Sequence, residues 1–412
     1  MNRCFLGLLV TSALAPWCAA ETLLVPKQFP TIQAAVDAAV GGDVVSVGPG
    51  VYAESVSIVG KAITLRGKGA KSIIEGRKNG LSIGACVVVT NAPGAVVENL
   101  TVRLATGSGD NGMGVRAFSD DVTVRKVRAL ACATTGILVV GAVATVDGCV
   151  VENCEGGIQI TSVGGLVTGC AVRRDGSVGF MVSGQACTVR KCVVDTIEDG
   201  EGIRLDANMS GVVDCKVRNV ADNAGVRLSS NFQSATNVDV RQIGDENAGI
   251  AVMGANSLVL NSRVRDCNGE GIAIFVGAST CEVRGNTIER AGTDENPGLL
   301  DEGVGSVIED NVVLDSDGHG IWLTKANAVC AGNRVERSRL DGIHLNSGLA
   351  GVQLTDNVVR FQHGEGLDLR SIPATMTGNT AIKNRTDFVT TVNGFTLPAT
   401  NVAATSGSPQ VD

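Results

Sequence analysis

Aromatic residues are scarce in this chain of 412 residues, which holds one tyrosine, two tryptophans and nine phenylalanines. So few rings cannot build the aromatic core of an ordinary globular domain. Valine and alanine are abundant instead, and there are 53 glycines. Small and β-branched side chains suit a narrow stack of strands. The composition therefore predicts an all-β chain with a thin interior.

Three further features are missing, and each excludes a class of function. No segment after the first twenty residues is apolar for long enough to span a membrane as a helix. The formal net charge is −8 and there is no basic tract, which argues against a nucleic-acid partner. No two cysteines have the Cys-x-x-Cys spacing of a zinc site. We expect a protein without a membrane span or nucleic acid, and we expect a monomer.

The first twenty residues have the pattern of an export signal. Arg3 gives the positive start, residues 4–10 are apolar, and Cys18-Ala19-Ala20 provides small residues for cleavage. Cleavage near Ala20/Glu21 would release a periplasmic or secreted protein. We therefore assign residues 1–20 to a signal peptide.

Twelve glycines recur at intervals of 21 to 24 residues, with one interval of 27. Most of them begin a four-residue motif of glycine, an aliphatic residue, a variable residue and another aliphatic residue, as in Gly202-Ile203-Arg204-Leu205, which we call the glycine phrase. These glycines are Gly114, Gly136, Gly157, Gly179, Gly202, Gly225, Gly249, Gly271, Gly298, Gly320, Gly342 and Gly366. A fixed period of this size indicates a solenoid, and the short alternating runs within each repeat indicate strands. The pattern predicts a right-handed parallel β-helix of about 13 coils.

The two ends of the chain differ from the repeats. Residues 30–40 have the pattern of a short amphipathic helix, within an N-terminal cap at about 22–41. Such a helix would cover the open edge of the first coil. We place the β-helix at residues 21–385 and a C-terminal cap and tail at 386–412.

Cysteines and asparagines occupy one turn position in successive repeats. They are Cys149, Cys170, Cys192 and Cys215, followed by Asn286, Asn311, Asn333 and Asn357. We interpret them as two internal ladders with a structural role rather than a redox or metal role. Disulfides between coils are feasible, because stacked strands lie roughly 4.8 Å apart and bridged Cα atoms need about 4.4–6.8 Å.

Two parts of the sequence resemble known β-helix families. The predicted helix and the segment Pro49-Gly50-Val51-Tyr52-Ala53-Glu54 are similar to the opening of pectin-lyase-like proteins. The Gly-Ile-x-Leu and Asn-x-Val repeats resemble carbohydrate-active β-helices, including mannuronan C-5 epimerases. They also resemble the periplasmic β-helix proteins of nitrous-oxide reductase maturation. The catalytic motifs of pectinesterases, pectate lyases and mannuronan epimerases are absent, so the resemblance implies a fold and a polysaccharide partner but no one activity.

The variable residue of each glycine phrase should point outward, since neighbouring side chains alternate along a strand. Stacked coils would align these residues in one outer column. The column reads Arg116, Leu138, Gln159, Met181, Arg204, Arg227, Ala251, Ala273, Leu300, Trp322, His344 and Asp368. Within it, Arg204 and Arg227 would form ion pairs with Glu201 and Asp206 or a distal site for an acidic sugar.

All three histidines of the chain, and the only tryptophan after residue 20, lie between residues 319 and 363. We predict a catalytic group there, in which His344 accepts a proton. Its members are His344, Asp341, Asp368, His319 and Arg370. The predicted substrate-binding residues are Trp322, Lys325, Asn346, Glu365, Arg204 and Arg227.

A base beside cationic groups suits removal of the proton next to a uronate carboxylate, as in polysaccharide lyases and epimerases. Hydrolysis stays open, because Asp341 or Glu365 could pair with Asp368 as two catalytic carboxylates. A non-catalytic carbohydrate-binding or adhesin-like protein, or a periplasmic maturation partner, is the remaining alternative. The segment of residues 291–303 accounts for the 27-residue interval as an insertion, and its Asp301 and Glu302 suggest a Ca²⁺ site.

Overall fold

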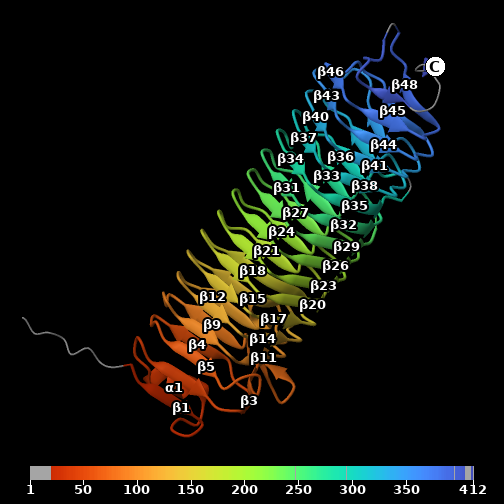
Figure 1. Ribbon diagram of the computed structural model, residues 1–412. Helices are drawn as coiled ribbons and strands as arrows, with labels where there is room; N and C mark the ends of the chain where they lie inside the picture. Colours follow the sequence, from red (N-terminus) through yellow and green to blue (C-terminus); the bar gives the residue numbers. More distant parts are fainter. Residues whose placement is uncertain (1–19, 246, 294, 394, 404–409, 412) are drawn as a thin grey trace, which may run out of the picture.

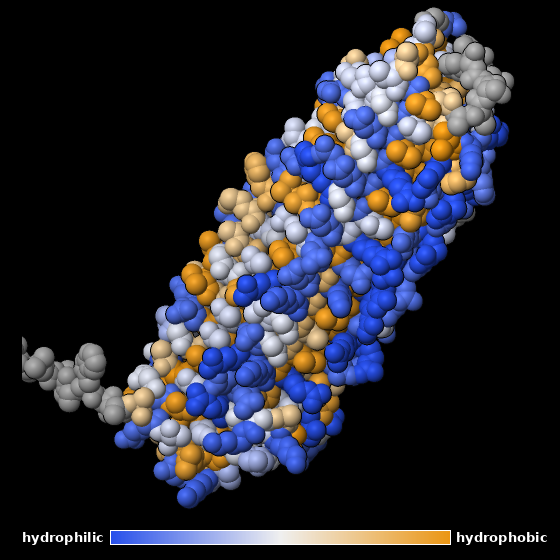
Figure 2. Space-filling view, in the orientation of Figure 1, coloured by the Kyte–Doolittle hydropathy of each residue, from blue (hydrophilic) through white to orange (hydrophobic). Residues whose placement is uncertain are grey.

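The computed structural model describes residues 20–245, 247–293, 295–393, 395–403 and 410–411, so nearly all of the predicted signal peptide lies outside the described residues. The strands of this part of the chain stack into one elongated β-helix, with the ends of the chain at opposite ends of the stack (Figure 1). The surface in view is mainly hydrophilic, with scattered hydrophobic residues (Figure 2). The prediction of an all-β solenoid is confirmed.

Three parallel sheets of 16 strands each form the walls of the β-helix. Sheet A consists of β1 (Thr22–Val25), β2 (Val44–Val47), β5 (Thr64–Gly67), β10 (Val96–Glu98), β13 (Thr123–Arg125), β16 (Thr145–Asp147), β19 (Leu166–Thr168), β22 (Thr188–Arg190), β25 (Gly211–Val213), β28 (Ser234–Thr236), β31 (Leu258–Leu260), β34 (Glu282–Arg284), β37 (Val307–Glu309), β40 (Val329–Ala331), β43 (Gln353–Thr355) and β46 (Thr375–Thr377). Sheet B consists of β3 (Gly50–Tyr52), β6 (Ser72–Glu75), β11 (Thr101–Arg103), β14 (Arg128–Leu130), β17 (Val150–Glu152), β20 (Ala171–Asp175), β23 (Val193–Ile197), β26 (Lys216–Val220), β29 (Asp239–Ile243), β32 (Arg263–Cys267), β35 (Thr287–Ala291), β38 (Val312–Leu314), β41 (Arg334–Glu336), β44 (Val358–Arg360), β47 (Thr380–Ile382) and β49 (Val402–Ala403). Sheet C consists of β4 (Val56–Val59), β9 (Val87–Thr90), β12 (Val115–Phe118), β15 (Thr135–Val140), β18 (Gly156–Thr161), β21 (Phe180–Val182), β24 (Ile203–Leu205), β27 (Val226–Leu228), β30 (Ile250–Val252), β33 (Ile272–Ile274), β36 (Leu299–Asp301), β39 (Ile321–Leu323), β42 (Ile343–Leu345), β45 (Glu365–Leu369), β48 (Thr386–Thr390) and β50 (Gln410–Val411).

The stack is longer than the predicted 13 coils, because each sheet has 16 strands. The additional coils lie at the two ends, where the glycine phrase is absent and the repeat cannot be counted from glycines. Strands β48, β49 and β50 continue sheets B and C into residues 386–412, for which the sequence predicts a cap and tail. Outside the three sheets lie the antiparallel hairpin of β7 (Arg77–Lys78) and β8 (Leu81–Ser82) and one 3₁₀ turn, η1 (Gly109–Gly112).

The predicted N-terminal helix is α1 (Ile32–Ala38), which lies at the first end of the stack (Figure 1). The Thr31 hydroxyl caps it by accepting a hydrogen bond from the Ala34 N–H at 3.2 Å. Ile32 and Val36 are buried against the first coils. This seven-residue helix therefore shields the interior at the open end. No described helix is long and apolar enough to cross a membrane.

The two predicted internal ladders are present. In the later coils the side-chain oxygens of Asn311, Asn333, Asn357, Asn379 and Asn401 each accept hydrogen bonds from the asparagine one coil earlier. Asn333 Oδ1, for example, lies 3.0 Å from both the backbone N and Nδ2 of Asn311. In the earlier coils cysteines occupy the same turn position, and the Cys149 N–H donates to Cys170 Sγ at 3.4 Å. All eleven described cysteines are free and buried, so the disulfides considered above do not form. The ladders are structural, because they satisfy backbone donors inside the turns.

The recurrent glycines mark places where sheet B approaches the start of each sheet C strand. A Cβ added to Gly342 would lie 2.1 Å from Val359 Cγ1 and 2.7 Å from the Gly366 carbonyl oxygen. No side chain fits at such distances, so the repeat keeps glycine there. The close approach also holds the turn before each sheet C strand in a fixed place, which positions His319 and Asp341.

One interior carboxyl group should make stability depend on pH. Asp175 is fully buried, and its Oδ1 accepts a hydrogen bond from the Cys154 N–H at 2.9 Å. Burial raises the pKa of Asp175 to about 7, although this hydrogen bond opposes the change. In the unfolded chain the Asp175 carboxyl group ionises from about pH 4, whereas in the folded protein it stays protonated up to about pH 7. The free energy of unfolding therefore falls as the pH rises from about 4 to about 7. Asp175→Asn should therefore stabilise the protein by about 2–4 kcal/mol at pH 8 and hardly at all at pH 4.

Urea unfolding at the two pH values measures this difference. Asp195→Asn is the matched control, because Asp195 is paired with Arg218 at 2.6 Å and that pairing lowers its pKa despite partial burial. Its replacement should destabilise slightly at pH 8. Equal effects of Asp175→Asn at both pH values would contradict the buried-carboxyl interpretation.

Candidate functional site

Strand pairing in sheet C confirms the predicted outer column residue by residue. Each member is paired with the next, from Arg116 with Leu138 to His344 with Asp368. Side chains of the column therefore rise in steps of one coil, roughly 4.8 Å. Its C-terminal part is less exposed than an outer surface usually is, since His344 and Asp368 are only 7% and 4% exposed.

Two histidines and two aspartates converge at this end of the column. The Asp341 carboxylate oxygen Oδ2 lies 3.2 Å from His319 Nδ1 and 3.1 Å from His344 Nδ1. His344 Nδ1 also lies 3.0 Å from Asp368 Oδ2. The backbone N–H of Glu365 fixes the other oxygen of Asp341 by donating a hydrogen bond at 2.9 Å. We call His319, Asp341, His344 and Asp368 the His–Asp cluster.

Aromatic contacts hold the imidazole rings in place. The rings of His319 and His344 lie 4.3 Å apart between centroids, tilted by 34°. Trp322 meets both edge-on, at 5.4 Å from His319 and 5.9 Å from His344. Its indole Nε1 donates to Asn346 Oδ1 at 2.9 Å, which fixes the plane of the indole. The cluster is therefore preorganised, with an aromatic side chain in the coil of His319 and one coil before His344.

The charges of the cluster depend on its hydrogen bonds. Burial alone would lower the pKa of His344, but hydrogen bonding to Asp341 and Asp368 and their negative charges outweigh burial and raise it to about 9. Burial opposes ionisation of Asp341, yet hydrogen bonds from both histidines hold its pKa well below the usual value. His344 is therefore an imidazolium at neutral pH, which differs from the neutral base expected from the sequence.

The ligand atoms of His319, Asp341 and His344 all lie within 4.8 Å of one another, so these three residues have the spacing of a metal site. Imidazole donors suit Zn²⁺ or a similar metal better than Ca²⁺, which prefers oxygen ligands. The hydrogen-bond distances within the cluster account for its convergence without an ion. We therefore assign no metal to it.

Other predicted site residues surround the cluster. Arg370 Nε lies 3.0 Å from Asp368 Oδ2 and the Arg370 side chain is 51% exposed, so it joins the cluster to the surface. Glu365 is paired with Arg385; burial and the nearby Asp341 carboxylate raise the pKa of Glu365. Lys325 lies in the turn after β39 and is partly exposed. The third histidine, His363, is exposed and stays outside the cluster.

The two arginines predicted as a distal site lie in β24 and β27. Arg204 Nε lies 2.7 Å from Asp206 Oδ1, and Arg227 Nη1 lies 3.0 Å from Glu201 Oε1. The ion pairs expected from the sequence are therefore present. Arg227 is five coils from His344 along the outer column.

The residues suggested for Ca²⁺ do not form a surface site. Asp301 is fully buried and pairs in register with Ile274 and Leu323, both interior positions. Its Oδ1 accepts a hydrogen bond from the Gly303 N–H at 3.0 Å, and burial raises its pKa to about 6. The carboxylate thus points away from the surface on which Glu302 would bind an ion. The sequence held a signal for this, because in the phrase Gly298-Leu299-Leu300-Asp301 the aspartate stands where most repeats have an interior aliphatic residue.

A second feature of the outer face was missed from the sequence. A strip of apolar side chains lies between Arg227 and the His–Asp cluster, outside the main core. Its buried members are Ala224, Ala248, Ala251, Ala273 and Leu300, and Phe275 and Trp322 pack against them. The column contains a signal for this strip, since Ala251, Ala273 and Leu300 follow one another at positions where polar residues are expected.

The sequence matches the family described as "Right handed beta helix region" over residues 85–242 and 224–401. Comparison with curated proteins found no match. Among solved structures, the A-module of Azotobacter vinelandii mannuronan C-5 epimerase AlgE4 is similar, with a TM-score of 0.55 and 17% identity, covering 68% of this chain and 89% of that one. A PL6 family polysaccharide lyase from Pseudopedobacter saltans has a TM-score of 0.52 and 16% identity, over 79% and 85% of the two chains. A PL6 alginate lyase in complex with a trisaccharide has a TM-score of 0.56 and 10% identity, over 82% and 85%. Likeness at these identities concerns the fold.

Proposed function

The chain belongs to the right-handed β-helix family, and we propose that it acts on a polysaccharide that contains uronate units. The reaction is removal of the proton next to the uronate carboxylate, by a lyase or an epimerase, at the His–Asp cluster. The observation that carries the proposal is this preorganised cluster beside Trp322 and Arg370 on the outer face of sheet C. The similar mannuronan epimerase and alginate lyase support the same reaction class.

The geometry favours different roles for the two histidines. His344 lies against two carboxylates and His319 against one. The proton that makes one of the two rings an imidazolium therefore resides on His344. His344 would then supply positive charge to the enolate-like intermediate. His319 Nδ1 lies 3.2 Å from Asp341 Oδ2 and 3.3 Å from the Asp341 backbone N. The tautomer that carries its hydrogen on Nδ1, toward the carboxylate, is the one that can accept the substrate proton at Nε2. The His319 side chain is also the more accessible one, at 14% exposed against 8% for His344.

Three neighbouring residues would position the sugar and its charge. Trp322 can stack on a sugar ring, as aromatic side chains do with apolar faces. Arg370 can hold the uronate carboxylate with the guanidinium donors that Asp368 does not use. For hydrolysis a general acid needs a raised pKa, which excludes Asp341 because its two histidines lower its pKa despite burial. The pKa of Glu365 is raised, so hydrolysis by Glu365 and Asp368 is the second candidate.

The test is conversion of alginate, polygalacturonate, chondroitin and a neutral glucan, with and without a chelator. Unsaturated products are followed by absorbance, reducing ends by a colour assay and epimerised units by NMR. We expect conversion of a uronate-containing glycan that survives the chelator. His319→Gln and His344→Gln should each lower the rate by about 10²–10⁴-fold, whereas the exposed His363→Gln should leave it unchanged.

The pH dependence gives a second readout of the same proposal. Since the pKa of His344 is raised to about 9 by its carboxylate partners, its positive charge is present below about pH 9 and is lost above it. Activity should therefore fall as the pH rises through about 9. An activity that instead rises up to this pH would make His344 the base. Binding of a glycan without any conversion would favour the carbohydrate-binding alternative. If no glycan is either bound or converted, the proposed function is refuted.

A further inference from the structure

A small pocket opens on the outer face of sheet C, at the far end of the apolar strip from the His–Asp cluster. Its volume is about 150 Å³. The lining residues are Asn223, Ala224, Arg227, Asn247, Ala248, Ala251, Met253 and Phe275. Ala251 and His344 are separated by four coil steps along the outer column. A cavity of this size holds one small ring or a substituent rather than an oligosaccharide.

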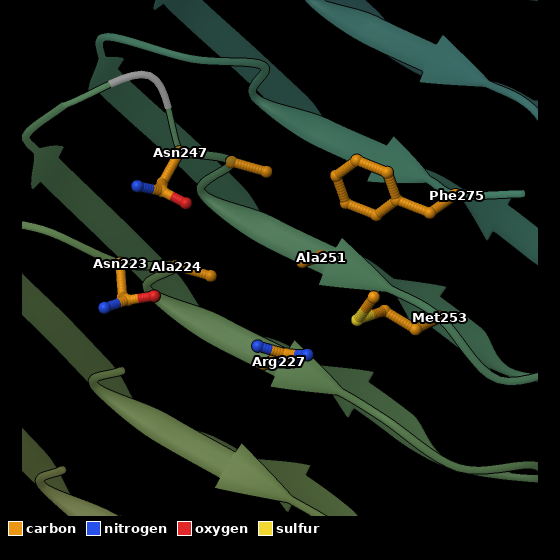
Figure 3. A pocket seen from close by; sticks show the side chains of 8 residues that line it. Asn223, Ala224, Arg227, Asn247, Ala251, Met253 and Phe275 are labelled. Carbon is orange, nitrogen blue, oxygen red and sulfur yellow. The ribbon is translucent and has the colours of Figure 1, made fainter. Parts of the chain in front are cut away.

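The two sides of the pocket differ in chemistry. Asn223 and Asn247 lie on one side, and Phe275 and Met253 lie on the other, with Ala251 between them (Figure 3). The amides come from the turns before β27 and β30, whereas Met253 and Phe275 directly follow β30 and β33. The pocket therefore offers polar groups along one edge and an apolar wall along the other.

The floor of the pocket is made of methyl groups. Ala224, Ala248 and Ala251 are 6%, 3% and 5% exposed, so only their Cβ atoms reach the cavity. Met253 is 40% exposed, and its thioether adds apolar surface to the pocket wall. An apolar group of methyl size would bury this surface, which favours binding through the hydrophobic effect.

The polar edge is held in place by hydrogen bonds outside the pocket. Asn247 Nδ2 donates to the Asp222 carbonyl oxygen at 2.9 Å, which fixes the Asn247 amide. Arg227 is fixed by Glu201, and its buried Nε has no hydrogen-bond partner among the described residues. The guanidinium thus keeps donors for a carbonyl or carboxylate oxygen beside the apolar floor.

A methyl group attached to a carbonyl matches both halves of this pocket. We propose that the pocket binds the acetyl group of an acetylated sugar unit in the glycan, with the methyl on the alanine floor and the carbonyl oxygen toward the Arg227 guanidinium. The inference rests on the proposed function for the identity of the ligand as a glycan. It adds that the protein selects chains that carry an acetylated unit about four coils, or roughly 19 Å, from the His–Asp cluster.

The test compares O-acetylated alginate with the same alginate after mild alkaline removal of its acetyl groups, by calorimetric titration and by initial rate. Wild-type protein should bind the acetylated form about ten-fold or more tightly, as expected for one small apolar substituent in a fitted pocket. Ala251→Leu should fill the pocket and abolish this preference. It should fold, because Leu138 and Leu300 occupy the same position in other coils. Gln159→Leu is the matched control in the same column, and it should keep the preference.

The outcomes separate the pocket from the reaction. Equal binding of both forms by wild-type protein, or an unaltered preference in Ala251→Leu, would refute the acetyl site. Conversion of either glycan in the same experiment would still support the proposed function. If neither form is bound or converted, the proposed function fails and the acetyl site fails with it.

Discussion

Replacement of Asp341 by asparagine should reduce the rate of glycan conversion by about 10²–10⁴-fold, the range of general acid–base catalysis. Asp341 Oδ2 contacts the Nδ1 atoms of both His319 and His344, so this one carboxylate supports both rings. Asparagine has nearly the same shape but offers no negative charge. His319 would lose the tautomer that leaves Nε2 free to accept a proton, and the pKa of His344 would fall because one of its two carboxylate partners is removed.

Initial rates and their pH dependence measure both effects. The decline in activity at high pH should move to lower pH in Asp341→Asn, which a merely structural defect would not produce. Asp315→Asn provides the matched control, since Asp315 is 40% exposed and paired with Arg337 at 2.6 Å away from the cluster. Its backbone has a φ of 57°, which asparagine tolerates. An Asp341→Asn protein with the wild-type rate would remove the His–Asp cluster from the mechanism.

Asn333→Ala should destabilise the protein by about 2–5 kcal/mol, because it breaks the internal asparagine ladder on both sides. The Asn333 Oδ1 atom accepts two hydrogen bonds from Asn311, and its Nδ2 donates to the Ile308 carbonyl oxygen at 2.8 Å and to Asn357 Oδ1 at 3.0 Å. All these groups lie in the interior, where no solvent replaces the lost partner. The buried Asn311 N–H would lose its acceptor, and the Ile308 carbonyl oxygen would lose the amide donor. The side-chain amides of Asn311 and Asn357 would each lose one hydrogen bond and keep another.

Denaturant unfolding followed by circular dichroism measures this loss. Asn208→Ala is the control, because Asn208 accepts one exposed hydrogen bond from the Asn231 N–H at 3.1 Å. It should cost less than about 1 kcal/mol. Equal effects of the two substitutions would mean that the interior ladder contributes no more than a surface hydrogen bond.

The sequence predicts the repeat and its register well, because both depend on a strict period. The glycine phrase places every member of the outer column, and the paired strands agree with it from Arg116 to Asp368. It also brings His319, His344 and their aspartates into neighbouring coils. Such placement needs only the rise of a coil and the alternation of a strand.

Properties that depend on side-chain packing between coils could not be predicted in this way. The pKa of His344 is raised, despite burial, because two carboxylates contact one ring atom. The strand register predicts which residues are neighbours, but it does not predict the distances between their side-chain atoms. Asp301 is a different case: the disturbed period suggests an insertion, but the glycine phrase that begins at Gly298 already places this residue at an interior position of β36, where it is buried. Met253 and Phe275 each lie two residues after a column member and so follow the same period, but a period does not show that their side chains enclose a pocket.

The stacking of the coils also sets the distances between sites along the outer face, because each distance is a whole number of coil steps. Ala251 and His344 are separated by a whole number of coils, and every coil adds the same rise of roughly 4.8 Å. Deletion of a complete repeat, such as the 22 residues from Pro297 to Gly318, would leave the remaining strands in register while bringing the two ends of the strip one step closer. Gain or loss of repeats, by duplication or deletion within the gene, would therefore change the distance between the pocket and the His–Asp cluster in discrete units, without any change to the residues at either end.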